Sequence, residues 1–248
     1  MKKFALLWGA VLLLTTSFVW AQSAPDSVCE VNTTVAKNAK AFEAARKKHN
    51  EFHKAEKDKN AIHVWEIISG PHTGAYLTTI CGMTWKGMDG HEDMDARDMA
   101  DVAKTIGPQS EHNMTSYYVL QPELGVAPGT DPNVKMLSVA TVFVKPSHYM
   151  QFVESAKRIK AALDKENYPG KRSTWYALAN GGVGPQFVVS TPRNGWADFQ
   201  APDVKFSDIL KKVYGDDDKT MEKYRESVDH VVSEILVLRK DLSYIPAM

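Results

Sequence analysis

The stretch at residues 62–81, IHVWEIISGPHTGAYLTTIC, decides the fold that the chain is predicted to adopt. Two runs rich in β-branched and aromatic residues flank a Gly/Pro turn, which is the pattern of a β-hairpin. The pattern returns later in the chain, where strands are predicted at residues 174–179 and 186–191 around the turn NGGVG. Trp65 and Trp175 hold the same place in the two copies, so the sequence predicts two like halves.

The segments around each hairpin follow the same order. In the first half we expect a strand at residues 28–31, a helix capped by residues 32–34, the hairpin, an acid-rich helix that stops before Pro108, and a strand at 112–120. In the second half we expect a strand at 137–144, a helix, the hairpin, a helix that stops at Gly215 with an added helical segment, and a strand at 231–238. The predicted order is β-α-β-β-α-β in each half.

Each half thus resembles a ferredoxin-like unit, and the pair resembles the dimeric α+β-barrel superfamily. The resemblance is carried by the element order and by the recurring hairpin residues Trp65, Gly74, Tyr76 and Trp175, Gly184, Phe187. It implies an α+β fold made of a tandem pair of units, with two four-stranded antiparallel sheets facing each other and strand order 4-1-3-2 in each. Members include cofactor-free monooxygenases, haem enzymes of the chlorite-dismutase type and proteins of unknown role, so the resemblance implies a fold and no activity.

The first residues are typical of a secretory signal peptide. Two lysines, Lys2 and Lys3, precede an apolar run at residues 4–14, and cleavage is expected after Ala21. A retained anchor is the alternative, but the run is shorter than the ~20 residues that a bilayer span needs. The expected organisation is therefore a signal peptide at 1–21, a first unit at 22–121, a linker at 122–134 and a second unit at 135–248, in a secreted or periplasmic protein without a mature membrane span.

Charge argues against nucleic acid as a partner. The 248 residues hold 30 basic and 30 acidic side chains, and loss of Lys2 and Lys3 leaves a net charge of −2 with no long block of either sign. Because both sheets come from one chain, a monomer is expected.

An acidic residue followed by histidine opens the last predicted strand of both halves: Glu111-His112 aligns with Asp229-His230. A carboxylate can fix an imidazole tautomer for acid/base work or metal ligation. Neighbouring residues of a strand face opposite sides, however, and a polar strand start is the plainer interpretation.

His49 lies on the apolar stripe of the first helix, where the second copy has Ile159. A buried histidine with one hydrogen-bond partner explains this residue, and ligation of haem is the alternative. No Cys-x-x-Cys-His attachment motif accompanies it.

Sulfur and imidazole side chains gather after the first hairpin, and in a secreted protein such ligands suit copper. They are Cys81, Met83, Met88, His91 and Met94. Methionines also fill cores, and the acidic residues 89–95 lack the spacing of a calcium loop, so no cofactor is favoured.

Trp85 and Trp196 follow the two hairpins in predicted loops, where an aromatic side chain can line a cleft for a small apolar or aromatic ligand. Trp65 and Trp175 alternate with apolar neighbours and are expected in the core.

A disulfide is expected between Cys29 and Cys81. They are the only two cysteines, and export would place them in an oxidising compartment. In the strand order 4-1-3-2, the first and third strands are antiparallel neighbours, so the start of one lies beside the end of the other. Copper ligation by Cys81 and two unpaired thiols remain the alternatives.

No nucleophile elbow, phosphate loop, zinc-protease helix or dinucleotide fingerprint is present in the sequence. The leading functional prediction is therefore a secreted or periplasmic, non-catalytic protein that binds a small ligand or serves as an accessory. The alternative is an oxidoreductase, cofactor-free or haem-dependent, that uses His112, His230 or His49.

Overall fold

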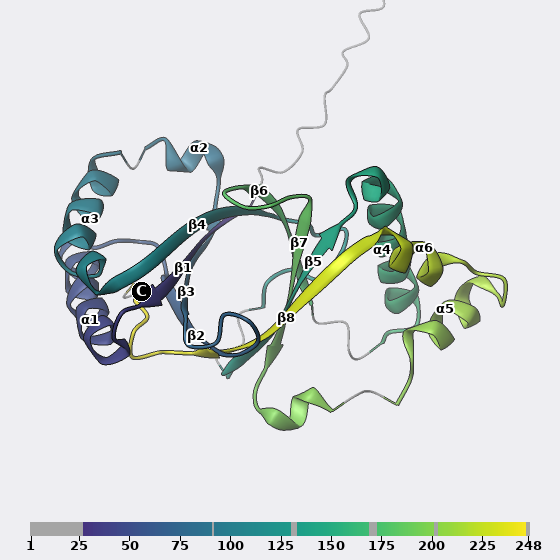
Figure 1. Ribbon diagram of the computed structural model, residues 1–248. Helices are drawn as coiled ribbons and strands as arrows, with labels where there is room; N and C mark the ends of the chain where they lie inside the picture. Colours follow the sequence, from purple (N-terminus) through teal and green to yellow (C-terminus); the bar gives the residue numbers. More distant parts are fainter. Residues whose placement is uncertain (1–26, 91, 130–132, 169–172, 201–202, 247–248) are drawn as a thin grey trace, which may run out of the picture.

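Eight antiparallel strands form one closed barrel, and helices lie on two opposite sides of it (Figure 1). The computed structural model describes residues 27–90, 92–129, 133–168, 173–200 and 203–246; the predicted signal peptide lies outside these residues. The strands are β1 (Val28–Ala36), β2 (His63–Ser69), β3 (Tyr76–Met83), β4 (Ser110–Leu120), β5 (Met136–Val144), β6 (Thr174–Asn180), β7 (Gln186–Arg193) and β8 (Val228–Leu238).

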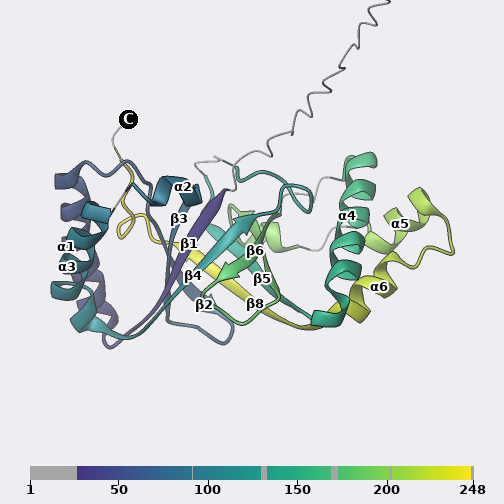
Figure 2. The same cartoon turned by 90° about the horizontal axis from the view of Figure 1, so that it is seen from above.

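The helices fall into two groups, which Figure 2 shows on either side of the barrel. One group holds α1 (Ala39–Glu56), α2 (Trp85–Met88) and α3 (Glu92–Lys104), and the other holds α4 (Tyr149–Lys165), α5 (Phe206–Tyr214) and α6 (Thr220–Ser227). Short 3₁₀ turns complete the order at η1 (Gly107–Gln109), η2 (Pro146–His148) and η3 (Trp196–Phe199). The predicted α+β class and the β-α-β-β-α-β order of each half are confirmed.

The strand order around the barrel is β1-β3-β2-β8-β5-β7-β6-β4. Within each half this is the expected 4-1-3-2 order. Two facing four-stranded sheets in a barrel-like arrangement were expected, and the structure shows how they join: β2 pairs with β8 and β4 pairs with β6, so the two halves meet edge to edge in one closed barrel. Edge strands carry unpaired backbone groups, and closure of the barrel satisfies them.

The start of α1 also differs from expectation. Residues 32–34 were predicted to cap the helix, but they continue β1, which pairs with β3 on one side and β4 on the other. Asn38 is the cap instead, and its Oδ1 accepts a hydrogen bond of 2.9 Å from the backbone N–H of Ala41. β-branched Thr33 and Thr34 suit a central strand better than a helix start.

Four apolar clusters make up the core of the described residues, and three of them tie the barrel to its helices. Trp65, Ile67 and Leu236 belong to the cluster that packs β2, β5 and β8 together, as predicted for Trp65. Phe42 of α1 packs with Val64 and Tyr76 on one side of the barrel, and Phe152 of α4 packs with Val142 and Phe187 on the other. Each group of helices therefore covers the outer face of its own half of the barrel.

The segment after β8 crosses back to the first half, and Figure 1 shows its yellow ribbon running from β8 toward α1. Arg239 Nη1 donates to Glu43 Oε1 at 2.6 Å and to Glu66 Oε2 at 2.9 Å. Leu242 is fully buried against Phe42 and Val64, and Tyr244 forms a β-bridge with Ile62. We call residues 239–244 the return segment.

Cys29 and Cys81 are register partners in β1 and β3 and form a disulfide, with their Cα atoms 3.9 Å apart. The predicted pairing is confirmed. Because both sulfurs are bonded to each other, Cys81 offers no thiolate to copper. In the described part of the chain, no helix combines the length and the apolar character that crossing a membrane requires.

Candidate functional site

The two acid-histidine pairs lie far from each other. His112 and His230 are exposed near the starts of β4 and β8, which stand on opposite sides of the eight-strand ring. Asp229 Oδ2 lies 2.7 Å from His230 Nδ1, and the His230 ring stacks on Phe143 with the centroids 4.2 Å apart. The structure therefore does not bring the two predicted pairs into one site. Glu111 is exposed beside His112.

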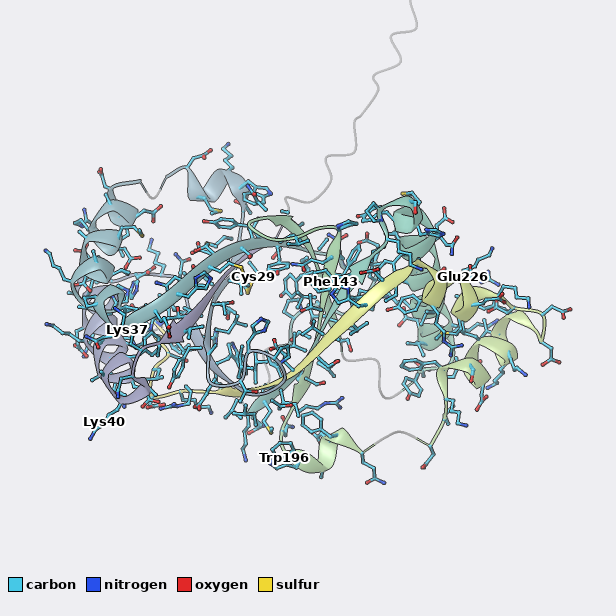
Figure 3. All side chains as sticks on the ribbon, in the orientation of Figure 1. Cys29, Lys37, Lys40, Phe143, Trp196 and Glu226 are labelled. Atoms are coloured by element: carbon cyan, nitrogen blue, oxygen red, sulfur yellow. A yellow bond between two sulfur atoms is a disulfide. The ribbon has the colours of Figure 1, made fainter. Side chains whose placement is uncertain are left out.

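The two predicted cleft tryptophans also lie in different halves. Trp85 begins α2, is 40% exposed, and has its ring 6.0 Å from that of Tyr117 on β4. Trp196 lies in η3, is 64% exposed, and packs against Phe199 on the outside of the molecule (Figure 3).

His49 lies at the centre of a polar cluster between α1 and α3. It is 1% exposed, and its Nδ1 lies 2.7 Å from Asp101 Oδ2 of α3. Its Nε2 lies 3.2 Å from Asp98 Oδ1, one turn earlier on the same helix. Burial on the helix face was predicted correctly, but His49 has several polar neighbours where one was expected.

His53 is the second member of the cluster, and the sequence analysis missed it. Its Nε2 lies 3.0 Å from His49 Nε2, and its Nδ1 lies 3.1 Å from Asp58 Oδ2, just beyond the helix. Residues four apart on a helix share a face, so the spacing of His49 and His53 was the available signal. Burial lowers the pKa of His53 and so favours its neutral form.

Asp98 and Arg46 complete the cluster. Asp98 Oδ1 is a buried oxygen without a hydrogen-bond partner among the described residues, 3.6 Å from His53 Nε2. Burial acts to raise the pKa of Asp98, but His49, His53 and Arg46 outweigh it and hold that pKa below its usual value. Arg46 is 5% exposed, and burial lowers its pKa to about 10.

Haem does not fit at His49. Both of its ring nitrogens face protein side chains at 2.7 to 3.2 Å, and α3 covers the ring. An iron ligand needs a nitrogen with free space in front of it for the porphyrin. We therefore derive no haem chemistry at this residue.

Polar side chains of β1 and β4, namely Glu30, Asn32 and Tyr117, lie on the half of the barrel that carries α1 and α3. Glu30 of β1 stands directly opposite Tyr117 of β4 and accepts a hydrogen bond of 2.8 Å from Asn32 Nδ2. Burial raises the pKa of Glu30, and nearby Asp95 and Asp98 add to the effect. Burial likewise raises the pKa of Tyr117. Sequence reasoning passed over Glu30, because its polar surroundings come from other elements.

The second half is apolar where the first half is polar. Ile159 and Leu163 of α4 are four residues apart, as His49 and His53 are, and pack with Ile209 and Leu210 of α5. The fold therefore does not require a charged cluster between its helices, because the second half packs there with apolar side chains. The first half holds both the histidine cluster and the Glu30–Tyr117 pair, so we take the side of the barrel that carries α1, α2 and α3 as the candidate functional site.

Known proteins match this chain in structure but not in sequence. No protein-family model matches, and no curated protein matches. A candidate monooxygenase from Lactobacillus acidophilus superposes with a TM-score of 0.55 at 8% identity, over 90% of this chain and 97% of that one. An anthrone oxidase-like protein gives 0.52 at 12% identity over 86% and 91% of the two chains, and a candidate monooxygenase from Fusobacterium nucleatum gives 0.52 at 10% over 88% and 94%.

These matches show that the chain has the dimeric α+β-barrel fold. They also correct the leading functional prediction, a non-catalytic binding or accessory protein, because these structural neighbours are described as monooxygenases and an oxidase-like protein. The oxidoreductase alternative has the better support. At such low identity the likeness itself concerns the fold, so the reaction has to be argued from the site.

Proposed function

We propose that this chain is an oxidoreductase that uses molecular oxygen on an electron-rich aromatic substrate. The observation that carries the proposal is Glu30, a carboxyl group with a raised pKa directly opposite Tyr117. The Trp85 ring lies beside that of Tyr117 and is 40% exposed, so solvent reaches this aromatic pair. A carboxylate whose pKa is raised is a stronger base than an ordinary one, which suits it to remove a proton from a bound substrate.

An anthrone is a suitable test substrate, since one structural neighbour is anthrone oxidase-like. Transfer of its acidic ring proton to Glu30 would leave an electron-rich anion that can reduce oxygen. Conversion of the ring CH₂ to a carbonyl consumes one O₂, places one oxygen atom in the product and releases the other as water. Trp85 and Tyr117 would hold the flat ring system while Glu30 transfers the proton.

Oxygen uptake with anthrone tests the proposal directly. Glu30→Gln keeps the shape of the side chain but removes the base, so the rate above background should fall by about 10²- to 10⁴-fold. Glu51→Gln changes an exposed carboxyl on α1 and should leave the rate unchanged. In the wild type the rate should rise as pH rises through the raised pKa of Glu30, because the base form is required. Equal rates for wild type and Glu30→Gln would exclude Glu30 as the base.

We also propose that the mature protein is exported as a monomer. The basic and apolar residues at 1–21 support export, and the Cys29–Cys81 disulfide is compatible with an oxidising compartment. The mass of the protein recovered from a periplasmic fraction should correspond to cleavage after Ala21, and sedimentation should give the mass of one chain. A full-length chain in the membrane fraction would contradict export.

A further inference from the structure

The contacts of His49 and His53 need one proton more than two neutral imidazoles carry. The ring nitrogens take part in three hydrogen bonds: His49 Nδ1 with Asp101, His53 Nδ1 with Asp58, and the two Nε2 atoms with each other. Each contact requires a hydrogen between two atoms that otherwise both present lone pairs. Two neutral rings supply two hydrogens for three contacts.

The carboxylates decide where those two hydrogens lie. A carboxylate is only an acceptor, and each ring has its nearest carboxylate at Nδ1: Asp101 at 2.7 Å from His49 and Asp58 at 3.1 Å from His53, against 3.2 and 3.6 Å for Asp98 at the Nε2 atoms. Asp101 and Asp58 therefore hold the hydrogens on the Nδ1 atoms. Both Nε2 atoms then present lone pairs to each other at 3.0 Å, and Asp98 Oδ1 adds a third acceptor at 3.2 and 3.6 Å. A cation among these three atoms would remove the repulsion between their lone pairs, and both a third hydrogen and a metal ion can supply it.

We propose that a divalent transition-metal ion binds between His49 Nε2, His53 Nε2 and Asp98 Oδ1. Two ligands each 2.0–2.1 Å from a tetrahedral zinc ion are about 3.3 Å apart. The three separations in the structure are 3.0, 3.2 and 3.6 Å, which bracket that value. The unpartnered Asp98 Oδ1 thereby gains a partner.

The contacts of the two Nδ1 atoms with carboxylates are those that metal-binding histidines commonly make. A ligating imidazole commonly donates its other N–H to a carboxylate, which fixes the tautomer and raises the basicity of the ligand. Asp101 does this for His49, and Asp58 does it for His53. Two ligands four residues apart on α1 are also held in place by the helix before any ion arrives.

Charge and donor type narrow the choice of ion. Three carboxylates and one guanidinium, Arg46, surround the neutral rings, which leaves two negative charges to balance a divalent cation. Two imidazole nitrogens favour a first-row transition metal over Mg²⁺ or Ca²⁺, which prefer oxygen ligands alone. The side chains of Asp98 and Asp101 are 31% and 29% exposed, which gives the ion a path from solvent.

This inference does not rest on the proposed oxidoreductase function, because it concerns binding alone. The test is calorimetric titration of the chelator-treated full chain with Zn²⁺, together with Co²⁺ titration followed by visible absorption. We expect one ion per chain and a four-coordinate Co²⁺ spectrum. His53→Gln and Asp98→Asn should each weaken Zn²⁺ binding at least 100-fold, and Asp101→Asn about 10- to 100-fold.

The matched control is His72→Gln, which removes an exposed histidine that also contacts a carboxylate, Glu234. It should leave Zn²⁺ binding unchanged. Because the ligand variants are buried changes, nitrogen NMR of the wild-type histidines provides a second readout: Zn²⁺ should shift both Nε2 resonances and leave both Nδ1 atoms protonated. The absence of a bound ion, binding that survives both ligand variants, or a proton shared between the Nε2 atoms in the presence of Zn²⁺ would overturn the proposal.

Discussion

Cys29 and Cys81 face each other across β1 and β3 and join two strands whose cysteines are 52 positions apart in sequence. Closing a loop of that size stabilises a protein by about 4 kcal/mol in the chain-entropy model. The Cys29→Ser/Cys81→Ser variant should therefore lose roughly that much free energy of unfolding in urea. Reducing agent should lower the stability of the wild type to that of the variant and leave the variant unchanged. Two reactive thiols in the unfolded, unreduced wild type would refute the bond.

Truncation of Leu242 tests the return segment. Leu242 is fully buried against Phe42 and Val64, so Leu242→Ala should cost about 2–5 kcal/mol of unfolding free energy. Ile245 lies three residues further along and is 60% exposed, so Ile245→Ala should cost less than about 0.5 kcal/mol. Urea denaturation of both variants makes the comparison. Equal losses would mean that the segment does not pack as described.

Tyr224 should make the protein less stable at alkaline pH. Burial raises the pKa of its phenol from 10.0 to about 12, so the folded protein keeps a proton that the unfolded chain loses between these values. The unfolded state is thus favoured as pH rises through that interval, and stability is highest below pH 10. In wild type the unfolding free energy should fall as the pH rises above 10. In Tyr224→Phe it should fall less steeply over the same interval, when each protein is compared with its own value at pH 7. Identical slopes for variant and wild type would contradict the assignment.

The exposed histidines His112 and His230 should matter little for stability. Their replacement by alanine, singly or together, is expected to change the unfolding free energy by less than about 1 kcal/mol. Thermal melts measure this, and anthrone-dependent oxygen uptake by the same variants shows whether either residue serves the reaction. A large loss of oxygen uptake with an unchanged melting temperature would mean that the active site lies at the start of β4 or β8.

The fold could be predicted largely because its signals are local. Alternation around Trp65 and Trp175, with glycine turns between the strands, defines the hairpins, and Gly74 and Gly181 do adopt positive φ. The pairing that closes the barrel has no comparable local pattern in the sequence. The pairing of β2 with β8 depends on which edges remain free after each half has formed, and no short stretch of sequence records that.

The candidate site was predictable only in part for the same reason. His49 stood out because a polar residue interrupted an apolar stripe. Its partners Asp101 and Asp98 belong to α3, which the sequence indicated only as an acid-rich helix. Glu30 gained its unusual environment from β4 and α3. Sequence periodicity identifies which face of a helix is buried, but it does not tell which distant side chains meet there.

The return segment has a consequence for the order in which the chain can mature. Glu43 and Arg239 are 196 positions apart, and the backbone oxygen of Leu242 accepts a hydrogen bond from Arg46 beside the histidines. During synthesis these last contacts form only after β8 has been made, long after α1 has left the ribosome. Tyr244, whose ring lies 5.5 Å from that of His53, and Leu242 are therefore the last neighbours of the histidine cluster to be added.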